Sequence, residues 1–324
     1  MDLQQISLAP LQALTVAVLG YGNQGRAQAL NLRDSGVRVL VGGRPGKSLD
    51  LAKAEGFTIL GNAEAARLAD IIMLLLPDQT IGQIYGEIRG ELTTKKAVGF
   101  AHGFAYHFRQ LGSLAPCAHF LVGPKGAGAI LRKKFEQGGG LPGVFALGEN
   151  ATDQTRQWAL AYAKAIGVAT SVLIETTFQQ ETESDLFGEQ SVLCGGIQQL
   201  METAFETLVE QGIAPEMAFF ESCYEAKLIL DLWVAHGPSG MAAKISPTAF
   251  YGGTTRGKRL VGEATKREMT RIFQEIRSGE FAREWLDEVR NGTPRLAAER
   301  ARLNDSLLEK TYRQLTRDGL RPEP

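Results

Sequence analysis

The chain has 324 residues, of which 44% are hydrophobic and 22% are charged, and its formal net charge is −1. This composition is typical of a folded globular protein and excludes a disordered chain. The balanced charge argues against a nucleic-acid-binding protein, because such proteins usually carry a basic surplus. The length allows about two domains, each large enough to bury a core.

No segment of the sequence indicates export or membrane insertion. The N-terminal residues lack the basic start of a signal peptide, and the apolar run 14–19 is too short to span a bilayer. The cysteines Cys117, Cys194 and Cys223 form no CxxC pair and predict reduced thiols. We therefore expect a cytoplasmic protein that acts on a small molecule and binds neither a membrane nor nucleic acid.

The first half of the chain alternates apolar, β-branched runs with helical segments. The strands are predicted at 15–19, 37–41, 57–60, 71–76, 96–100, 119–122, 144–147 and 169–174. Helices are predicted at 26–35, 48–55 and 63–69. Repeated strand–helix units with right-handed crossovers predict an α/β, doubly wound Rossmann domain over residues 1–178.

A glycine-rich turn joins the first predicted strand to the first predicted helix. It reads Gly20-Tyr21-Gly22-Asn23-Gln24-Gly25, a G-x-G-x-x-G motif. In this context the first glycine permits a tight turn, the second lets a pyrophosphate approach the backbone, and the third permits close packing of the helix. The alternative is a glycine-rich turn without a ligand. The strand–turn–helix context favours dinucleotide binding.

The end of the second predicted strand bears on which dinucleotide binds. NAD sites usually place an acid there for the ribose 2′-hydroxyl, but the first acid after this strand is Asp50. Arg44, Lys47 and Ser48 can instead hold a 2′-phosphate by charge-assisted hydrogen bonds. We therefore expect NADPH rather than NADH, although both basic residues could form an ordinary surface turn.

The second half of the chain reads as helical. The spacing of apolar residues predicts a mostly buried helix over 184–210, broken by Gly212 and Pro215. It predicts a second long helix over 215–235 and a charged helical tail from 256 onward. The C-terminal domain, residues 179–324, is therefore expected to be all-α.

The acidic residues concentrate in this helical part. Residues 165–226 contain no Lys or Arg but 11 acidic residues, whereas the segments before and after each carry a surplus of five positive charges. Two pairs, Asp185 with Glu189 and Glu221 with Glu225, are four residues apart, so each pair shares a helix face. Carboxylates without nearby His or Cys suit Mg²⁺, and two pairs could hold two ions. The alternative is that these acids form solvated helix faces.

Several motifs in chain order resemble one known family. The motifs are Gly20-Tyr-Gly-Asn-Gln-Gly25, Phe100-Ala-His-Gly-Phe104, Pro124-Lys-Gly126, Glu175-Thr-Thr-Phe178, Glu181-Thr-Glu-Ser-Asp-Leu-Phe-Gly-Glu-Gln190 and Ser191-Val-Leu-Cys-Gly-Gly196. The match covers nearly the whole chain, and the Asp-Leu-Phe-Gly-Glu-Gln block is highly specific. The sequence resembles ketol-acid reductoisomerase of the short, class I type.

The resemblance implies a Mg²⁺- and NADPH-dependent enzyme of branched-chain amino-acid biosynthesis, with NADH as an alternative cofactor. Such an enzyme converts 2-acetolactate and 2-aceto-2-hydroxybutyrate to 2,3-dihydroxy-3-methyl acids by alkyl migration followed by hydride reduction. The resemblance also implies that the helical domain is knotted. It further implies a homodimer with shared active sites, which assembles into a dodecamer in part of the family.

The resemblance assigns roles to individual residues. Asp185 would bridge two Mg²⁺ ions, Glu189 would bind one, and Glu221 and Glu225 would come from the partner subunit. His102, Lys125 and Glu225 would be catalytic, and Ser246 would bind the substrate carboxylate. By residue chemistry alone, His102 could equally be a satisfied core histidine. Further cofactor contacts are implied at Asp78, Gln79, Thr80, Ile81, His102 and Gly128.

Some positions depart from the usual pattern of the family. They are Ala105, Ala127, Ala129, Tyr224, Pro247 and Phe250. Because these positions flank the expected metal and substrate ligands, they can reshape the pocket without removing its chemistry. A second hypothesis is therefore a diverged paralogue that reduces another α-keto or hydroxy-keto acid in specialised metabolism. A third is a non-catalytic dinucleotide-binding protein.

Overall fold

The computed structural model describes residues 3–320 of the chain. The chain divides into two compact units, one ending at Ser184 and the other starting at Asp185. The predicted division at 178/179 lies at the start of the helix that contains this boundary, α9 (Phe178–Gly188). In the described part of the chain, no helix is both long enough and apolar enough to cross a membrane.

Within the described residues, the first unit contains an eight-stranded sheet in the order β3-β2-β1-β4-β5-β6-β7-β8. The strands are β1 (Thr15–Leu19), β2 (Arg38–Gly42), β3 (Thr58–Leu60), β4 (Ile71–Leu74), β5 (Ala97–Phe100), β6 (Ala118–Pro124), β7 (Gly143–Leu147) and β8 (Leu173–Thr176). Neighbouring strands pair in parallel except β6 and β7, which are antiparallel. The doubly wound α/β prediction is confirmed.

Seven of the predicted strands lie at or within two residues of their observed positions. The strand predicted at 169–174 is displaced, because β8 begins only at Leu173. Val168 and Ala169 are buried in the core next to Gly167, which has a positive φ of 84° and turns the chain. Their apolar character therefore comes from packing after a helix end rather than from strand pairing.

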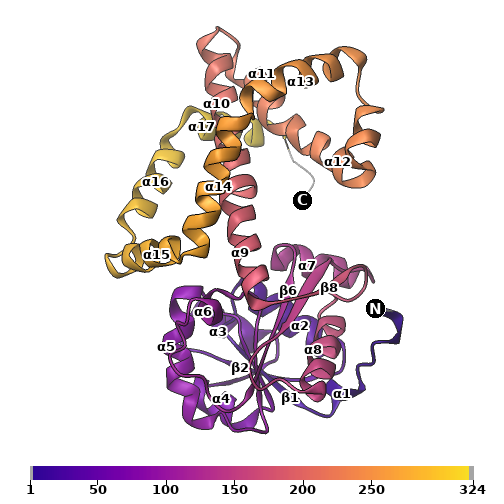
Figure 1. Ribbon diagram of the computed structural model, residues 1–324, viewed down its shortest axis with the longest axis vertical. Coiled ribbons are helices and arrows are strands. Elements are labelled where there is room, and N and C mark those ends of the chain that lie inside the picture. Colours follow the sequence, from indigo (N-terminus) through magenta and orange to yellow (C-terminus); the bar gives the residue numbers. More distant parts are fainter. Residues whose placement is uncertain (1–2, 321–324) are drawn as a thin grey trace. The chain divides into compact units, whose positions relative to one another are not determined.

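Helices cover both faces of this sheet (Figure 1). They are η1 (Leu3–Gln5), α1 (Ala9–Gln12), α2 (Asn23–Asp34), α3 (Lys47–Ala54), α4 (Asn62–Leu68), α5 (Asp78–Ile88), η2 (Arg89–Glu91), α6 (Phe104–His107), α7 (Gly128–Glu136) and α8 (Asp153–Ala165). In β1, Val16 and Val18 pack in one core while Ala17 and Leu19 pack in the other. A strand buried on both faces explains the unbroken apolar run in the sequence.

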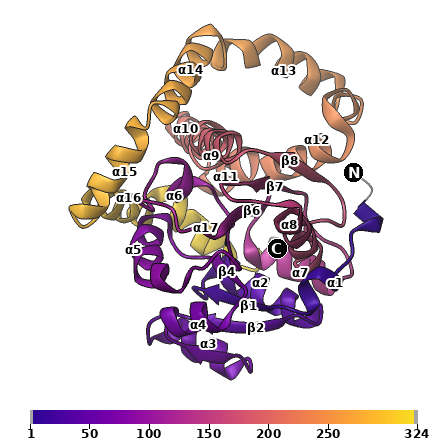
Figure 2. The same ribbon diagram turned by 60° about the horizontal axis from the view of Figure 1, so that its bottom comes forward.

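The second unit is helical, as predicted. Beyond α9 it contains η3 (Glu189–Leu193), α10 (Gly196–Glu210), α11 (Pro215–Phe219), η4 (Phe220–Tyr224), α12 (Glu225–Ala242), α13 (Pro247–Leu260), α14 (Glu263–Arg277), α15 (Glu280–Arg290), α16 (Pro294–Asp305) and α17 (Leu307–Arg317). Figure 2 shows α12, α13 and α14 following one another as an arc. The knot implied by the resemblance stays a prediction.

The prediction of one mostly buried helix over 184–210 is wrong. The segment is divided by the π-helical turn η3, where the amide of Cys194 donates to the carbonyl of Glu189 over 2.8 Å. A Cβ on Gly195 would overlap the carbonyl oxygen of Gln190, so glycine is needed after this turn. Leu193 and Leu200 are also 63% and 53% exposed, so the apolar spacing does not mark a buried face here.

Candidate active site and dinucleotide site

The predicted site residues of the first unit follow the carboxyl ends of parallel strands. Gly20 follows β1, Arg44 follows β2, Asp78 comes after β4, His102 follows β5, and Lys125 follows β6. Because parallel strands end at the same edge of a sheet, this is the edge at which doubly wound folds bind their ligands.

The glycine-rich turn has the geometry that a dinucleotide site requires. Gly20 has a φ of +96°, which side chains other than glycine rarely adopt, and a Cβ there would lie 2.5 Å from the carbonyl oxygen of Leu75. A Cβ on Gly25 would overlap the carbonyl oxygen of Gly20. A Cβ on Gly22 would meet no atom within 4 Å. Gly20 and Gly25 are therefore required by the fold, and Gly22 leaves open space at the N-terminus of α2.

The residues between these glycines tie α2 to α7. The Asn23 Oδ1 atom accepts a hydrogen bond from the Ala129 amide over 3.1 Å, and the Gln24 side chain donates to the carbonyl of Gly126 over 2.9 Å. A Cβ on Gly128 would overlap the Asn23 carbonyl, so the start of α7 can approach only through a glycine. These contacts hold the N-termini of two helices together, where their unpaired amides favour anions.

A cavity of about 370 Å³ lies beside the glycine-rich turn. Of the predicted cofactor residues, it is lined by Gly20, Tyr21, Gly22, Arg44, Ser48 and Thr80. Its lining does not include Asn23, Gln24, Gly25, Lys47, Asp78, Gln79, Ile81, His102 or Gly128. Its volume lies in the range of small-molecule sites.

Seven further residues that were not predicted from the sequence also line this cavity: Gly43, Leu49, Asn62, Leu75, Leu76, Pro77 and Ile84. Among the described residues, the buried Oδ1 atom of Asn62 has no hydrogen-bond partner. A buried acceptor without a partner is unfavourable unless a ligand donates to it. Asn62 begins the helix after β3, and its position beyond a parallel strand was the available signal.

Glu181 forms the centre of a second polar group. Its side chain is 2% exposed, its Oε2 atom accepts the Gly103 amide over 2.9 Å, and its Oε1 atom lies 3.5 Å from the Lys125 Nζ atom. A Cβ on Gly103 would overlap the Thr182 hydroxyl, so this loop can pack against α9 only through a glycine. The amide and the ammonium compensate the cost of burying the carboxylate.

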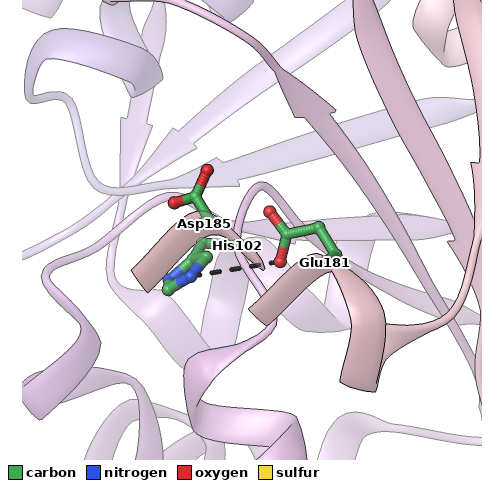
Figure 3. A group of neighbouring side chains, drawn as sticks. All are labelled: His102, Glu181 and Asp185. Atoms are coloured by element: carbon green, nitrogen blue, oxygen red, sulfur yellow. Dashed lines mark ion pairs between the residues drawn. The ribbon is translucent and has the colours of Figure 1, made fainter. Parts of the chain in front are cut away.

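His102 links this group to the start of α5. Its Nδ1 atom lies 3.4 Å from the Asp78 carboxylate, and its Nε2 atom lies 4.0 Å from Glu181 Oε2. Figure 3 shows the His102 ring facing Glu181. Glu181 and Asp185 both lie on helix α9. One ligand atom from each of His102, Glu181 and Asp185 lies within 4.8 Å of the others. Two carboxylates and an imidazole in this arrangement can hold a cation or move protons.

Glu181 was not predicted as a site residue, although it stands four positions before Asp185. The same spacing that paired Asp185 with Glu189 would have found it. A neighbouring pair, His107 and Glu183, repeats the pattern at 4.0 Å between Nε2 and Oε1. Burial lowers the pKa of His107, while the charge of Glu183 opposes this change.

The remaining predicted ligands lie in the helical unit. Glu189 begins η3, Glu221 lies in η4, and Glu225 begins α12, and all three are exposed. Among the described residues, none of them joins a metal-binding group of three or more ligands. Ser246 caps α13, where its hydroxyl accepts the Ala249 amide over 3.1 Å.

Both units match known protein families. Residues 10–171 match the family described as acetohydroxy acid isomeroreductase, NADPH-binding domain. Residues 178–319 match the family described as ketol-acid reductoisomerase, C-terminal domain.

One solved structure agrees with this family, and two others share the fold. An NADH-preferring ketol-acid reductoisomerase from an uncultured archean is 38% identical, covers 98% of each chain and has a TM-score of 0.94. A semialdehyde dehydrogenase NAD-binding protein from Cupriavidus necator is 20% identical over 82% of this chain and 99% of that chain, with a TM-score of 0.64. A pyrroline-5-carboxylate reductase from Coxiella burnetii is 18% identical over 81% and 97%, with a TM-score of 0.57.

The semialdehyde dehydrogenase and the pyrroline-5-carboxylate reductase share only their fold with this chain, at 20% and 18% identity. The ketol-acid reductoisomerase is a relative over 98% of both chains. The chain belongs to the ketol-acid reductoisomerase family, whose members are oxidoreductases and isomerases that bind a nicotinamide dinucleotide, and its length fits the short, class I type.

Proposed function

We propose that the protein is a Mg²⁺- and NADPH-dependent ketol-acid reductoisomerase of the cytoplasm that converts 2-acetolactate and 2-aceto-2-hydroxybutyrate to 2,3-dihydroxy-3-methyl acids. The observation that carries the proposal is the buried carboxylate of Glu181 between His102, Lys125 and the Gly103 amide, on the sheet edge that bears the dinucleotide cavity. This arrangement supplies proton transfer beside a hydride donor. The domains are assigned as 1–178 for the dinucleotide and 179–324 for the metals.

The cavity supports the assignment of the nucleotide. The open space above Gly22 admits a pyrophosphate at the N-terminus of α2, and the Asn62 acceptor is suited to an amino group such as that of adenine. Arg44 and Ser48 line the cavity, and Lys47 begins α3 beside them, so a 2′-phosphate would find positive charge there. NADH remains the alternative, in keeping with the NADH-preferring relative.

The donor set near His102 fits Mg²⁺. Glu181 and Asp185 offer carboxylate oxygens, which Mg²⁺ prefers as ligands. We assign Asp185 and Glu189 of one subunit, with Glu221 and Glu225 of the partner subunit, to two ions. When bound, these ions would polarise the substrate oxygens and stabilise negative charge there.

The chain's own residues account for the proton transfers. During alkyl migration the C2 hydroxyl of 2-acetolactate loses a proton, and the oxygen of the neighbouring ketone gains one. Lys125 and Glu181, 3.5 Å apart, can carry this proton between the two oxygens. A bound nicotinamide dinucleotide would supply the hydride that reduces the new C2 ketone, and Lys125 or His102 would give a proton to the ketone oxygen. Ser246 would bind the substrate carboxylate.

A homodimer with shared active sites is part of the proposal. In the described part of the chain, α12 and α13 contribute no buried residue. They expose apolar side chains such as Trp233, Val234 and Tyr251, at 49%, 84% and 67%. Exposed apolar surface of this kind marks a protein interface. Because Glu225 begins α12, a second subunit seated there would carry Glu221 and Glu225 into the shared site.

The test is turnover of 2-acetolactate by the purified protein with NADPH or NADH, each with Mg²⁺ or with excess EDTA. We expect Mg²⁺-dependent oxidation of NADPH, with slower use of NADH. Absence of turnover in a folded, dinucleotide-binding, Mg²⁺-loaded sample would contradict the proposal and favour a non-catalytic protein.

The second candidate is a reductase for another hydroxy-keto acid, which the departures in the helical unit favour. Tyr224 lies between Glu221 and Glu225 with its ring 5.7 Å from that of Phe220, while Pro247 begins α13 and Phe250 is 47% exposed. Reduction of a 3-hydroxy-2-keto acid without turnover of 2-acetolactate would support this candidate.

A further inference from the structure

Arg44, the residue assigned above to the 2′-phosphate, already has a carboxylate partner. Its Nη2 atom lies 3.2 Å from the Oε1 atom of Glu87, and their side chains are 65% and 40% exposed. The Gln83 side chain donates to the same oxygen of Glu87 over 3.0 Å. The Glu87 carboxylate therefore has one neutral donor, Gln83, and one cationic partner, Arg44. All three residues belong to the α/β unit.

Helix geometry places Glu87 next to the dinucleotide cavity. Thr80, Ile84 and Glu87 lie four and three residues apart on α5, so they share one face of the helix. Thr80 and Ile84 line the cavity together with Arg44. Glu87 continues this face by one turn and meets Arg44 from the side of α5.

A 2′-phosphate bound at Arg44 would meet this carboxylate. A phosphate monoester carries about −1.5 to −2 charges at neutral pH, so it would approach Glu87 against like charge and compete with it for the guanidinium. The ribose 2′-hydroxyl of NADH carries no charge, so Glu87 neither repels it nor competes with it for Arg44. We propose that Glu87 competes with the 2′-phosphate for Arg44 and thereby limits the selectivity of this protein for NADPH over NADH. This inference rests on the proposed function, in which Arg44 binds the 2′-phosphate.

The experiment compares two fragments that differ only in the phosphate in question. Binding of 2′,5′-ADP and of 5′-AMP is measured by calorimetric titration for the wild type and for Glu87→Gln. We expect Glu87→Gln to bind 2′,5′-ADP about two- to fivefold more tightly, the size of effect that an exposed ion pair supports. Its affinity for 5′-AMP should stay unchanged. In turnover, the same variant should shift the ratio of NADPH to NADH efficiency toward NADPH by the same factor.

Two controls distinguish competition at the Glu87–Arg44 pair from the effect of removing one negative charge anywhere in the unit. Glu91→Gln removes the same charge in η2, where Glu91 has no ion pair with Arg44, and should leave both affinities unchanged. Arg44→Gln should weaken the preference for 2′,5′-ADP, because only Lys47 and Ser48 then remain for the 2′-phosphate. Adding Glu87→Gln to Arg44→Gln should then tighten binding less than it does in the wild type, because only like-charge repulsion is left to relieve; the double-mutant cycle isolates the interaction of the pair. Thermal unfolding of each variant confirms that it is folded.

The outcomes distinguish this inference from the function on which it rests. If the wild type prefers 2′,5′-ADP but Glu87→Gln binds it no more tightly, the competition is overturned while the NADPH assignment stands. If Glu87→Gln binds 2′,5′-ADP more weakly, Glu87 assists binding of the 2′-phosphate by orienting Arg44, and the proposed competition is wrong. If both proteins bind the two fragments equally, the NADPH assignment and the inference fall together.

Discussion

Strand β1 and helix α12 show how differently the two units use apolar residues. Val16, Ala17, Val18 and Leu19 of β1 are fully buried, whereas Val234 of α12 is 84% exposed. The α/β unit also lines a cavity and places Lys125 beside Glu181 with its own side chains. In the helical unit, Glu221 and Glu225 are exposed and join no such group among the described residues. The α/β unit therefore lines its cavity by itself, whereas the helical unit leaves acids and apolar side chains exposed.

The largest expected effect separates metal chemistry from dinucleotide binding. Glu221→Gln removes one carboxylate of the proposed metal site in the helical unit, whereas the residues that line the cavity belong to the α/β unit. We expect turnover to fall about 10²- to 10³-fold, the scale of losing one electrostatic contact to the transition state. NADPH binding, measured by fluorescence titration, should be unchanged. Glu206→Gln, an exposed acid on α10, is the matched control and should keep full turnover.

Charge placed on the exposed face of α12 should show whether the helical unit needs a partner. Val234→Glu puts a carboxylate at a position that is 84% exposed in one chain but buried in the proposed dimer. Because an unpaired charge in an interface is costly, we expect dissociation to monomers and a loss of turnover of at least about tenfold. Sedimentation gives the mass. Arg300→Glu on α16 controls for charge reversal at an exposed site, and a Val234→Glu dimer with normal turnover would count against the proposal.

Substitutions at two of the three glycines of the dinucleotide turn, Gly22 and Gly25, should separate folding from binding within the α/β unit. Gly25→Ala would overlap the Gly20 carbonyl and should destabilise the fold by about 1–3 kcal/mol. In Gly22→Ala the added Cβ would have no atom within 4 Å, so the thermal unfolding midpoint of this variant should not change. Its methyl group would occupy the space left for the pyrophosphate, which should weaken NADPH binding about tenfold, or roughly 1.4 kcal/mol. Equal effects of both variants on stability would contradict this division.

The smallest expected effect concerns acid stability of the α/β unit. His119 is fully buried, its Nε2 atom lies 3.0 Å from the Tyr85 hydroxyl, and burial lowers its pKa, with a smaller opposing effect from the Glu149 carbonyl. The unfolded chain therefore binds the proton more readily, so stability is full above about pH 6.5 and is lost as the pH falls below it. The loss should not exceed about 1.4 kcal/mol per pH unit for this group.

His119→Gln should make this dependence shallower in urea-unfolding midpoints measured between about pH 7 and pH 5. His107 would contribute with the same sign, since burial lowers its pKa too. An unchanged slope in the variant would mean that His119 does not titrate in this range.

Much of the α/β unit follows from local pattern. The strand predicted at 15–19 coincides with β1, because a buried parallel strand needs an unbroken apolar run and Gly20 ends it. The helical unit was harder to predict, since the π-helical turn at Glu189 arises from backbone hydrogen bonding that apolar spacing does not reveal. The spacing of Glu181 from Asp185 marks it as a candidate, but only its hydrogen bond with the Gly103 loop, which is distant in sequence, shows that it belongs to the site.

The sequence by itself determined the order of the strands and helices, the glycine-rich turn and the positions of the acids, because these depend on local spacing and residue size. Only the tertiary structure decided that β7 runs antiparallel to β6, that Glu181 lies between His102 and Lys125, and that Arg44 is paired with Glu87. Each of these joins segments far apart in the chain. Their energies come from backbone hydrogen bonding between strands, desolvation and charge pairing, which exist only after the segments have packed together.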